Sequence, residues 1–194
     1  MKKEFWDLEE SIGFKEVKSR LDSLYYKVWN KGNNTSEVAL VLSKVRRDIN
    51  KLLTYLLNNK ELWINKPIAY GVVHTIELHL LNGNDSRFNY QEMTPNKHGI
   101  LGLNKPKVIK TIEVNINGKI REYEIAEKRS IFLTIRNQIT WEINDYSKIM
   151  DLAIHELTHT TCNDVRWKTD NHRPPYQSYH TLMRKWAREC GIMN

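Results

Sequence analysis

Apolar residues recur at helical spacing in four parts of the chain. These parts are residues 14–30, 35–59, 146–163 and 176–190. Apolar side chains at positions i, i+3, i+4 and i+7 lie on one face of a helix, so each part is predicted to be an amphipathic helix. Lys31-Gly-Asn-Asn separates the first two, and Thr35 or Ser36 is expected to cap the second. We therefore predict an antiparallel helical hairpin at the N-terminus, which braces the rest of the fold.

The pattern changes to a period of two between Tyr70 and Leu81. Alternating apolar and polar positions predict a half-buried β-strand. His74 lies among the apolar positions and is expected to be a hydrogen-bonded core histidine. His79 lies among the polar positions, so we expect it to face solvent.

The clearest turn signal is Asn117-Gly118, which lies between two strand patterns. A two-residue type I′ turn needs a positive φ at both central positions, and asparagine and glycine tolerate this. Such a turn would pair Ile116 with Lys119 and would place Glu113 opposite Glu122 on a solvated face. We therefore predict a β-hairpin in this register.

Two further strands are expected near this hairpin. Ser130 to Arg136 is apolar on both faces, which is typical of a more buried strand. Residues 82–107 are rich in Gly, Asn, Asp and Pro and are predicted to form a long loop. Within that loop, Gly99-Ile-Leu-Gly-Leu is expected to form a short strand at the rim of a functional site.

Composition narrows the class of protein. A length of 194 residues with 40% apolar and 27% charged residues suits a globular protein of one domain with an appendage. The net charge of +7 favours solubility and contact with polyanions such as DNA. Cys162 and Cys190 do not make a disulfide framework and suit a reducing compartment. No apolar run resembles a signal peptide or a membrane span. We therefore expect an intracellular protein of the cytoplasm or nucleus, without a membrane partner.

The candidate chemistry lies in the third predicted helix, which contains His155-Glu156-Leu-Thr-His159. Residues i and i+4 of a helix lie one above the other, so both imidazoles can reach one metal ion. Glu156 lies one residue round from His155, where it can take a proton from a water that the metal activates. The spacing therefore predicts a zinc hydrolase. The alternative is an amphipathic helix whose two histidines are solvated or hydrogen-bonded to the backbone.

A catalytic zinc needs a third protein ligand. The extended motif with Gly and His after the second His is absent, because positions 162 and 165 are Cys and Val. The remaining candidates are His172, His180, Cys162, Asp164, Asp170 and Glu189. We expect His172, because it lies in a polar segment just before Pro174-Pro175, where the backbone can turn back toward the motif helix. His180 lies inside the last predicted helix, and Cys162 is expected to be a small packing residue.

The order of these residues resembles the WLM and SprT-like families of zinc metalloproteases. Those families show His-Glu-Leu-x-His, then a third histidine, then an aromatic residue about four positions further on. Here His172 and Tyr176 follow the motif in that order. The match covers residues 145–190, with weaker support back to about residue 70. Twelve residues separate His159 from His172, which is long for the WLM pattern. Similar proteins are encoded by large DNA viruses, so a viral origin and a place in the virion stay open.

The pattern and the resemblance together imply an α+β, zincin-like fold. The motif helix would pack on a small, mostly antiparallel sheet, with the N-terminal helical hairpin outside it. We expect residues 1–65 to form this helical segment and residues 66–194 to form the metalloprotease domain. The resemblance also implies a zinc-dependent metallopeptidase that acts on DNA-associated or crosslinked proteins.

Several assignments stay open at this stage. Tyr176, Tyr179 and His180 are candidates for an oxyanion donor or for substrate contacts. A second function is a non-enzymatic, zinc-stabilised module that binds nucleic acid through a basic surface. A third is a metal hydrolase that acts on a non-peptide bond. A structural zinc site would need no general base at Glu156 and would fill its fourth position with a protein ligand.

Overall fold

The computed structural model describes residues 13–80, 87–93, 99–116, 118–137, 139–162, 172 and 175–194. Its elements follow in the order β1 (Phe14–Lys18), β2 (Tyr25–Trp29), α2 (Thr35–Asn58), η1 (Lys60–Leu62), α3 (Ala69–His79), β3 (Phe88–Glu92), β4 (Gly102–Ile116), β5 (Lys119–Leu133), α4 (Tyr146–Thr161) and α5 (Tyr176–Glu189). The expected α+β class is confirmed.

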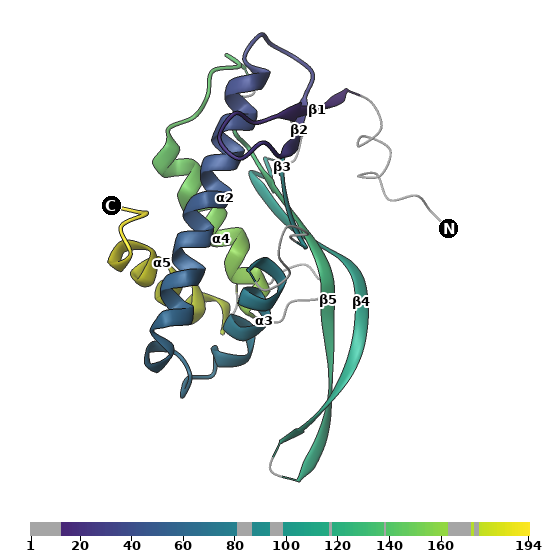
Figure 1. The fold of residues 1–194 in the computed structure, drawn as a ribbon, viewed down its shortest axis with the longest axis vertical. Coiled ribbons are helices and arrows are strands. Elements are labelled where there is room, and N and C mark those ends of the chain that lie inside the picture. Colours follow the sequence, from purple (N-terminus) through teal and green to yellow (C-terminus); the bar gives the residue numbers. More distant parts are fainter. Residues whose placement is uncertain are drawn as a thin grey trace.

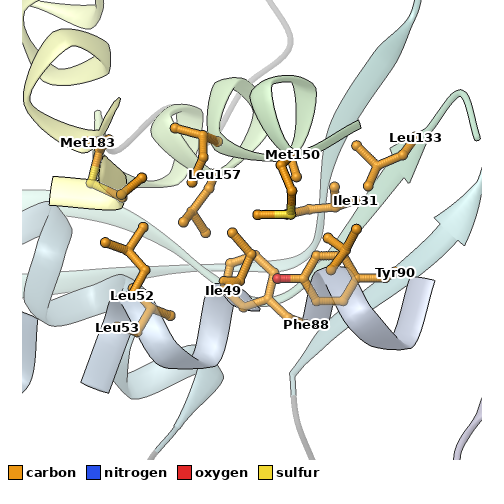
Figure 2. Packing of buried hydrophobic residues seen from close by; sticks show 14 of the residues in the cluster. Ile49, Leu52, Leu53, Phe88, Tyr90, Ile131, Leu133, Met150, Leu157 and Met183 are labelled. Carbon is orange, nitrogen blue, oxygen red and sulfur yellow. The ribbon is translucent and has the colours of Figure 1, made fainter. Parts of the chain in front are cut away.

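One apolar core joins the helices to the sheet. The long helix α2 lies beside α4, and both pack against the strands (Figure 1). Figure 2 labels core side chains from α2, β3, β5, α4 and α5: Ile49, Leu52, Leu53, Phe88, Tyr90, Ile131, Leu133, Met150, Leu157 and Met183. Burying a side chain of this size stabilises the fold by about 1.5–3 kcal/mol. The helix that carries the histidine motif is therefore fixed by its opposite face.

Helix α2 occupies the predicted span, but the predicted cap is wrong. Thr35 is the first helical residue, and the N-cap is Asn34, which makes no capping hydrogen bond. The Asn34 side chain bonds outward instead: its Nδ2 donates to the Trp141 carbonyl at 3.0 Å, and its Oδ1 accepts from Arg136 at 3.1 Å. These contacts fasten the start of α2 to the segment after β5.

The predicted helix over residues 14–30 is wrong, and with it the N-terminal helical hairpin. This part forms the antiparallel β-hairpin β1–β2, in which Phe14 pairs with Trp29. The turn is closed by Ser19 N–H donating to the Leu24 carbonyl at 2.8 Å. The second strand is Tyr-Tyr-Lys-Val-Trp, and aromatic and β-branched residues favour strands. Tyr26 and Val28 are buried on one side, so the pattern in this strand has a period of two.

The predicted strand between Tyr70 and Leu81 is also wrong, because this part is helix α3. Apolar and polar residues of α3 are buried together around most of the helix, and a short segment of that kind gives no reliable period. Gly71 explains the tight fit: a Cβ there would lie 1.8 Å from the Thr161 carbonyl oxygen at the end of α4. Only a glycine allows α3 and α4 to approach this closely.

The two histidines of α3 differ from their predicted roles. His79 is 4% exposed instead of facing solvent, and its Nε2 lies 2.8 Å from the Tyr90 hydroxyl. His74 is buried as expected, but its Nε2 has no hydrogen-bond partner in the described part of the chain. Burial lowers the pKa of His74 to about 4 and that of His79 to about 3, so both rings are neutral at pH 7.

The hairpin centred on residues 117 and 118 has the predicted register. Ile116 pairs with Lys119, and Glu113 pairs with Glu122 on exposed positions. Gly118 has a φ of 79°, as a type I′ turn requires. The two strands form a long ribbon that extends past the helices (Figure 1). Strand β5 is central in the order β3-β5-β4, pairing in parallel with β3 and antiparallel with β4.

Strand β5 continues into the predicted buried strand. Ser130 to Leu133 are buried, and the strand ends at Leu133 instead of Arg136. The predicted long loop is shorter than expected, since β3 and the start of β4 lie within residues 82–107. The short strand expected at residues 99–103 is the beginning of β4, which starts at Gly102.

The two C-terminal helices agree with the sequence. Helix α4 begins directly after Asp145, and α5 ends before Cys190, followed by Gly191 with a φ of 71°. The segment between them lies outside the described residues, apart from His172 and Pro175. Among the described helices, none is long and apolar enough to cross a bilayer.

Candidate metal centre

Helix α4 presents His155 and His159 on one face. The two ring centroids lie 5.3 Å apart, as expected for residues one turn apart. The opposite side of the helix, which includes Ala153, Ile154 and Leu157, is fully buried in the core. Because that side cannot rotate outward without exposing apolar surface, the helix holds both imidazoles toward the space in front of it.

His172 completes a group of three. One side-chain nitrogen from each of His155, His159 and His172 lies within 4.8 Å of the other two. The Nε2 atoms of His172 and His155 are 3.0 Å apart. Nitrogens bound to one tetrahedral zinc at about 2.1 Å are about 3.4 Å apart, so this group fits zinc after a small adjustment. His172 therefore lies close enough to serve as a third ligand, and that role stays a prediction.

The protonation state of His155 suits a metal ligand. The pKa of His155 is lowered to about 4, first by burial and then by the neighbouring histidines. A histidine binds a metal through its neutral form, so a neutral ring at pH 7 is ready to coordinate. His172 is exposed, while His155 and His159 are half-buried, which leaves the group open on one side.

Glu156 lies next to His155 on α4, but its side chain is inside the protein. It is 4% exposed, and burial alone raises the pKa of its carboxyl to about 8. Its Oε1 packs on the start of β4, where a Cβ on Gly102 would be only 2.5 Å away. A metal ion at the three imidazoles would favour the ionised form of this carboxyl, and in that form Glu156 has the position of a general base.

Tyr176 packs across the histidine group. Its ring centroid lies 4.6 Å from that of His159 and 4.9 Å from that of His172. Its hydroxyl donates to the His155 carbonyl oxygen at 3.1 Å. Burial, and then the negative charge of Glu156, raise its pKa, so the hydroxyl stays protonated. In this arrangement Tyr176 fixes α5 against α4.

His180 lies next to Tyr176 on helix α5. Its ring stacks on Tyr176 with centroids 5.6 Å apart and lies 5.4 Å from the His155 ring. It is not part of the group of three histidines, and its buried Nε2 has no hydrogen-bond partner in the region that the structure describes. Tyr179 is half-buried on the same helix. Their proposed roles as oxyanion donors or substrate contacts stay predictions.

None of the other ligand candidates that the structure describes belongs to this group. Cys162 is the C-cap of α4 and is half-buried. Glu189, at the end of α5, accepts a hydrogen bond from Tyr55 at 3.2 Å. Asp164 and Asp170 lie outside the described residues. The three histidines are the only group with metal-ligand geometry in the described part of the chain.

The sequence analysis did not identify the residues of β4 and β5 that pack against Glu156. Gly102 touches its carboxyl, and Asn104 donates a hydrogen bond to its backbone carbonyl at 2.5 Å. Arg129 donates in turn to Asn104 at 3.0 Å. No motif marks these three residues. The sole signal was the expectation that residues 99–103 form a strand at the rim of a site.

Comparisons with protein-family models, curated proteins and solved structures found no match. The resemblance to the WLM and SprT-like families therefore stays a prediction that rests on the motif and the order of residues.

Proposed function

We propose that this protein is a zinc-dependent metallopeptidase in which His155, His159 and His172 bind the metal. The observation that carries the proposal is the convergence of these three imidazoles beside the buried carboxyl of Glu156. Zinc bound there would polarise the scissile carbonyl and lower the pKa of its bound water to about 7. The open side of the group leaves room for that water and for substrate.

Glu156 is the general base in this proposal. It accepts the proton of the attacking water and later passes it to the leaving amine. Glu156 is not a metal ligand in this proposal, because it lies one residue round the helix from His155 and its carboxyl packs on Gly102. Tyr176 holds the ligand face of α4 in place through the His155 carbonyl.

The edge of the sheet supports a polypeptide substrate over a non-peptide one. Strand β4 is last in the order β3-β5-β4, so its outer edge has no partner among the described strands. An extended peptide can join such an edge through main-chain hydrogen bonds. Because Gly102 begins β4 and touches Glu156, a peptide on this edge would pass the general base.

The charge supports substrates that are associated with DNA. The net charge is +7, and the exposed lysines Lys107 and Lys128 face each other across β4 and β5. Like charges opposite each other in a sheet repel, and a phosphate backbone beside them would relieve this repulsion. The same charge supports the alternative function, a zinc-stabilised nucleic-acid-binding module without catalysis.

The test is hydrolysis of a denatured protein substrate by the zinc-loaded chain, with and without single-stranded DNA. The Glu156→Gln variant should bind one zinc per chain and lose activity by about 100-fold or more, because the amide keeps the shape without the base. The matched control is Glu113→Gln, which changes an exposed carboxyl on the β4–β5 hairpin and should keep full activity. Equal activity in Glu156→Gln and the parent would exclude this mechanism. Zinc and DNA binding without hydrolysis in the parent would favour the alternative.

A further inference from the structure

Strand β4 contacts the motif helix α4 through the side of the strand that carries residues 102 and 104. At position 102 there is no side chain, and a methyl group there would lie 2.5 Å from Glu156 Oε1 and 2.7 Å from Leu152 Cδ1. Contacts under 3.0 Å between these atoms require one of them to move. The Glu156 carboxyl therefore occupies the space that any other residue at position 102 would need.

Asn104 ties the same strand to the backbone of the same helix. Its Nδ2 donates to the Glu156 carbonyl at 2.5 Å and to the Thr160 hydroxyl at 2.9 Å. The Asn104 side chain is 9% exposed, so water does not compete strongly for these bonds. The two acceptors lie one helical turn apart, and the contact therefore sets both the distance and the rotation of α4 relative to β4.

Arg129 fixes the orientation of the Asn104 amide. It lies on the central strand β5 and is 1% exposed, and its Nη1 donates to Asn104 Oδ1 at 3.0 Å. Because the amide oxygen is occupied by this donor, the amide nitrogen must point to α4. The backbone of Arg129 is itself bound to the residue that precedes β3, since its N–H donates to the Arg87 carbonyl at 2.8 Å.

We infer that Gly102, Asn104 and Arg129 form a positioning device for the general base. Asn104 and Arg129 hold β4 at a fixed distance from α4, and Gly102 leaves at that distance a space that the Glu156 carboxyl fills. The kinetic part of this inference rests on the proposed peptidase function, but the placement of the carboxyl does not.

Two substitutions address the two parts of the device. Gly102→Ala inserts a methyl group where the carboxyl lies, and Asn104 prevents the strand from moving back. Asn104→Asp replaces one nitrogen by oxygen, so it still accepts from Arg129 but cannot donate to α4. Thr111→Ala, at an exposed position of the same strand, is the matched control.

The first measurement does not depend on activity. In zinc-loaded protein labelled with ¹³C at the glutamate carboxyl carbon, the Glu156 signal is identified by its loss in Glu156→Gln. We expect this signal to shift in Gly102→Ala and Asn104→Asp and to stay at the parent position in Thr111→Ala. Zinc should bind all variants with the parent affinity, because neither substitution touches a ligand.

The second measurement is the rate of peptide hydrolysis. A displacement of about 1 Å of a catalytic group costs about 100-fold, so kcat should fall by that factor in Gly102→Ala while KM stays within about threefold. If Gly102→Ala folds poorly, adding Leu152→Ala removes the second contact of the new methyl group, and Asn104→Asp tests the inference separately.

The outcomes distinguish the two proposals. An unchanged Glu156 signal in both Gly102→Ala and Asn104→Asp would overturn the positioning device, whatever the rates are. A shifted signal in both variants supports it. A parent protein that hydrolyses nothing, but whose Glu156 signal shifts in both variants, would refute the peptidase function and leave the device in place.

Discussion

Replacing Arg136 with methionine should destabilise the fold more than replacing an exposed charged residue does. The Arg136 and Glu92 side chains are 2% and 3% exposed, and Nε of Arg136 lies 2.7 Å from Oε1 of Glu92. Nη2 of Arg136 donates to Oε2 of Glu92 and to the Trp29 carbonyl, both at 2.8 Å. The pair therefore joins β2 and β3 to the segment after β5.

The expected magnitude follows from what remains after the substitution. With methionine at position 136, the Glu92 carboxylate would stay buried without its guanidinium partner. Among the described residues, its remaining hydrogen-bond donor would be the Trp29 N–H at 2.8 Å. The Trp29 carbonyl would lose the guanidinium as well. Breaking a buried pair from one side costs about 3–5 kcal/mol in unfolding free energy. Adding Glu92→Leu removes the stranded charge, and the double variant should recover about 1–2 kcal/mol of this loss.

Urea denaturation followed by tryptophan fluorescence measures this effect. The control is Arg47→Met, which breaks an ion pair with the same 2.7 Å distance to Asp48 but at a side chain that is 58% exposed. That control should cost less than about 1 kcal/mol. A loss for Arg136→Met as small as that of Arg47→Met, with an unchanged m value, would refute the reasoning.

Four other results are expected. His172→Ala should lose bound zinc whereas His180→Ala keeps it, as measured by metal content after dialysis; the reverse result would assign the third ligand to His180. Removing zinc with a chelator should lower the melting temperature by about 10 °C, because saturating metal adds about 4 kcal/mol; no change would speak against a bound metal. The pKa of His79 is lowered to about 3 in the fold and is about 6.5 when unfolded, so the unfolded chain takes up the proton first and stability falls as pH drops below 6.5. His79→Gln should therefore lose about 2 kcal/mol less than the parent between pH 8 and pH 5 in urea denaturation, and parallel losses would contradict the burial of this ring. DNA binding should be detectable by fluorescence anisotropy at low ionic strength and weaken steeply with salt; no binding at low salt would dismiss it.

The sequence predicted those elements whose signals are local and long. Helix α2 has a buried stripe over many turns, and the β4–β5 register depends on one turn, Asn117-Gly118. The motif helix α4 was marked by its chemistry as well as by its period. In each case the physical constraint lies within the segment itself, so neighbours in space do not alter it.

The two segments whose secondary structure was predicted wrongly share a cause. In residues 14–30 the spacing of four apolar residues fitted a helix, but Leu21 is 43% exposed and belongs to the turn of a hairpin. In α3 the surroundings bury polar residues such as Thr75 and His79, which removes the helical period from the sequence. Short segments take their structure from the tertiary contacts, and these are not visible along the chain.

The residues of the candidate site also fall into a part that the sequence predicted and a part that it did not. His155, Glu156 and His159 are set by one helical turn, and the order of residues was sufficient to favour His172. Gly102, Asn104 and Arg129 come from two strands far from the motif, and their contact with Glu156 exists only after the sheet has formed.

A crystal structure of the zinc-loaded protein tests the central claim most directly. The account predicts zinc bound by one nitrogen from each of His155, His159 and His172, with water in the fourth position within hydrogen-bond reach of Glu156. A fourth protein ligand such as Cys162 in place of water, or zinc bound without His172, would contradict it.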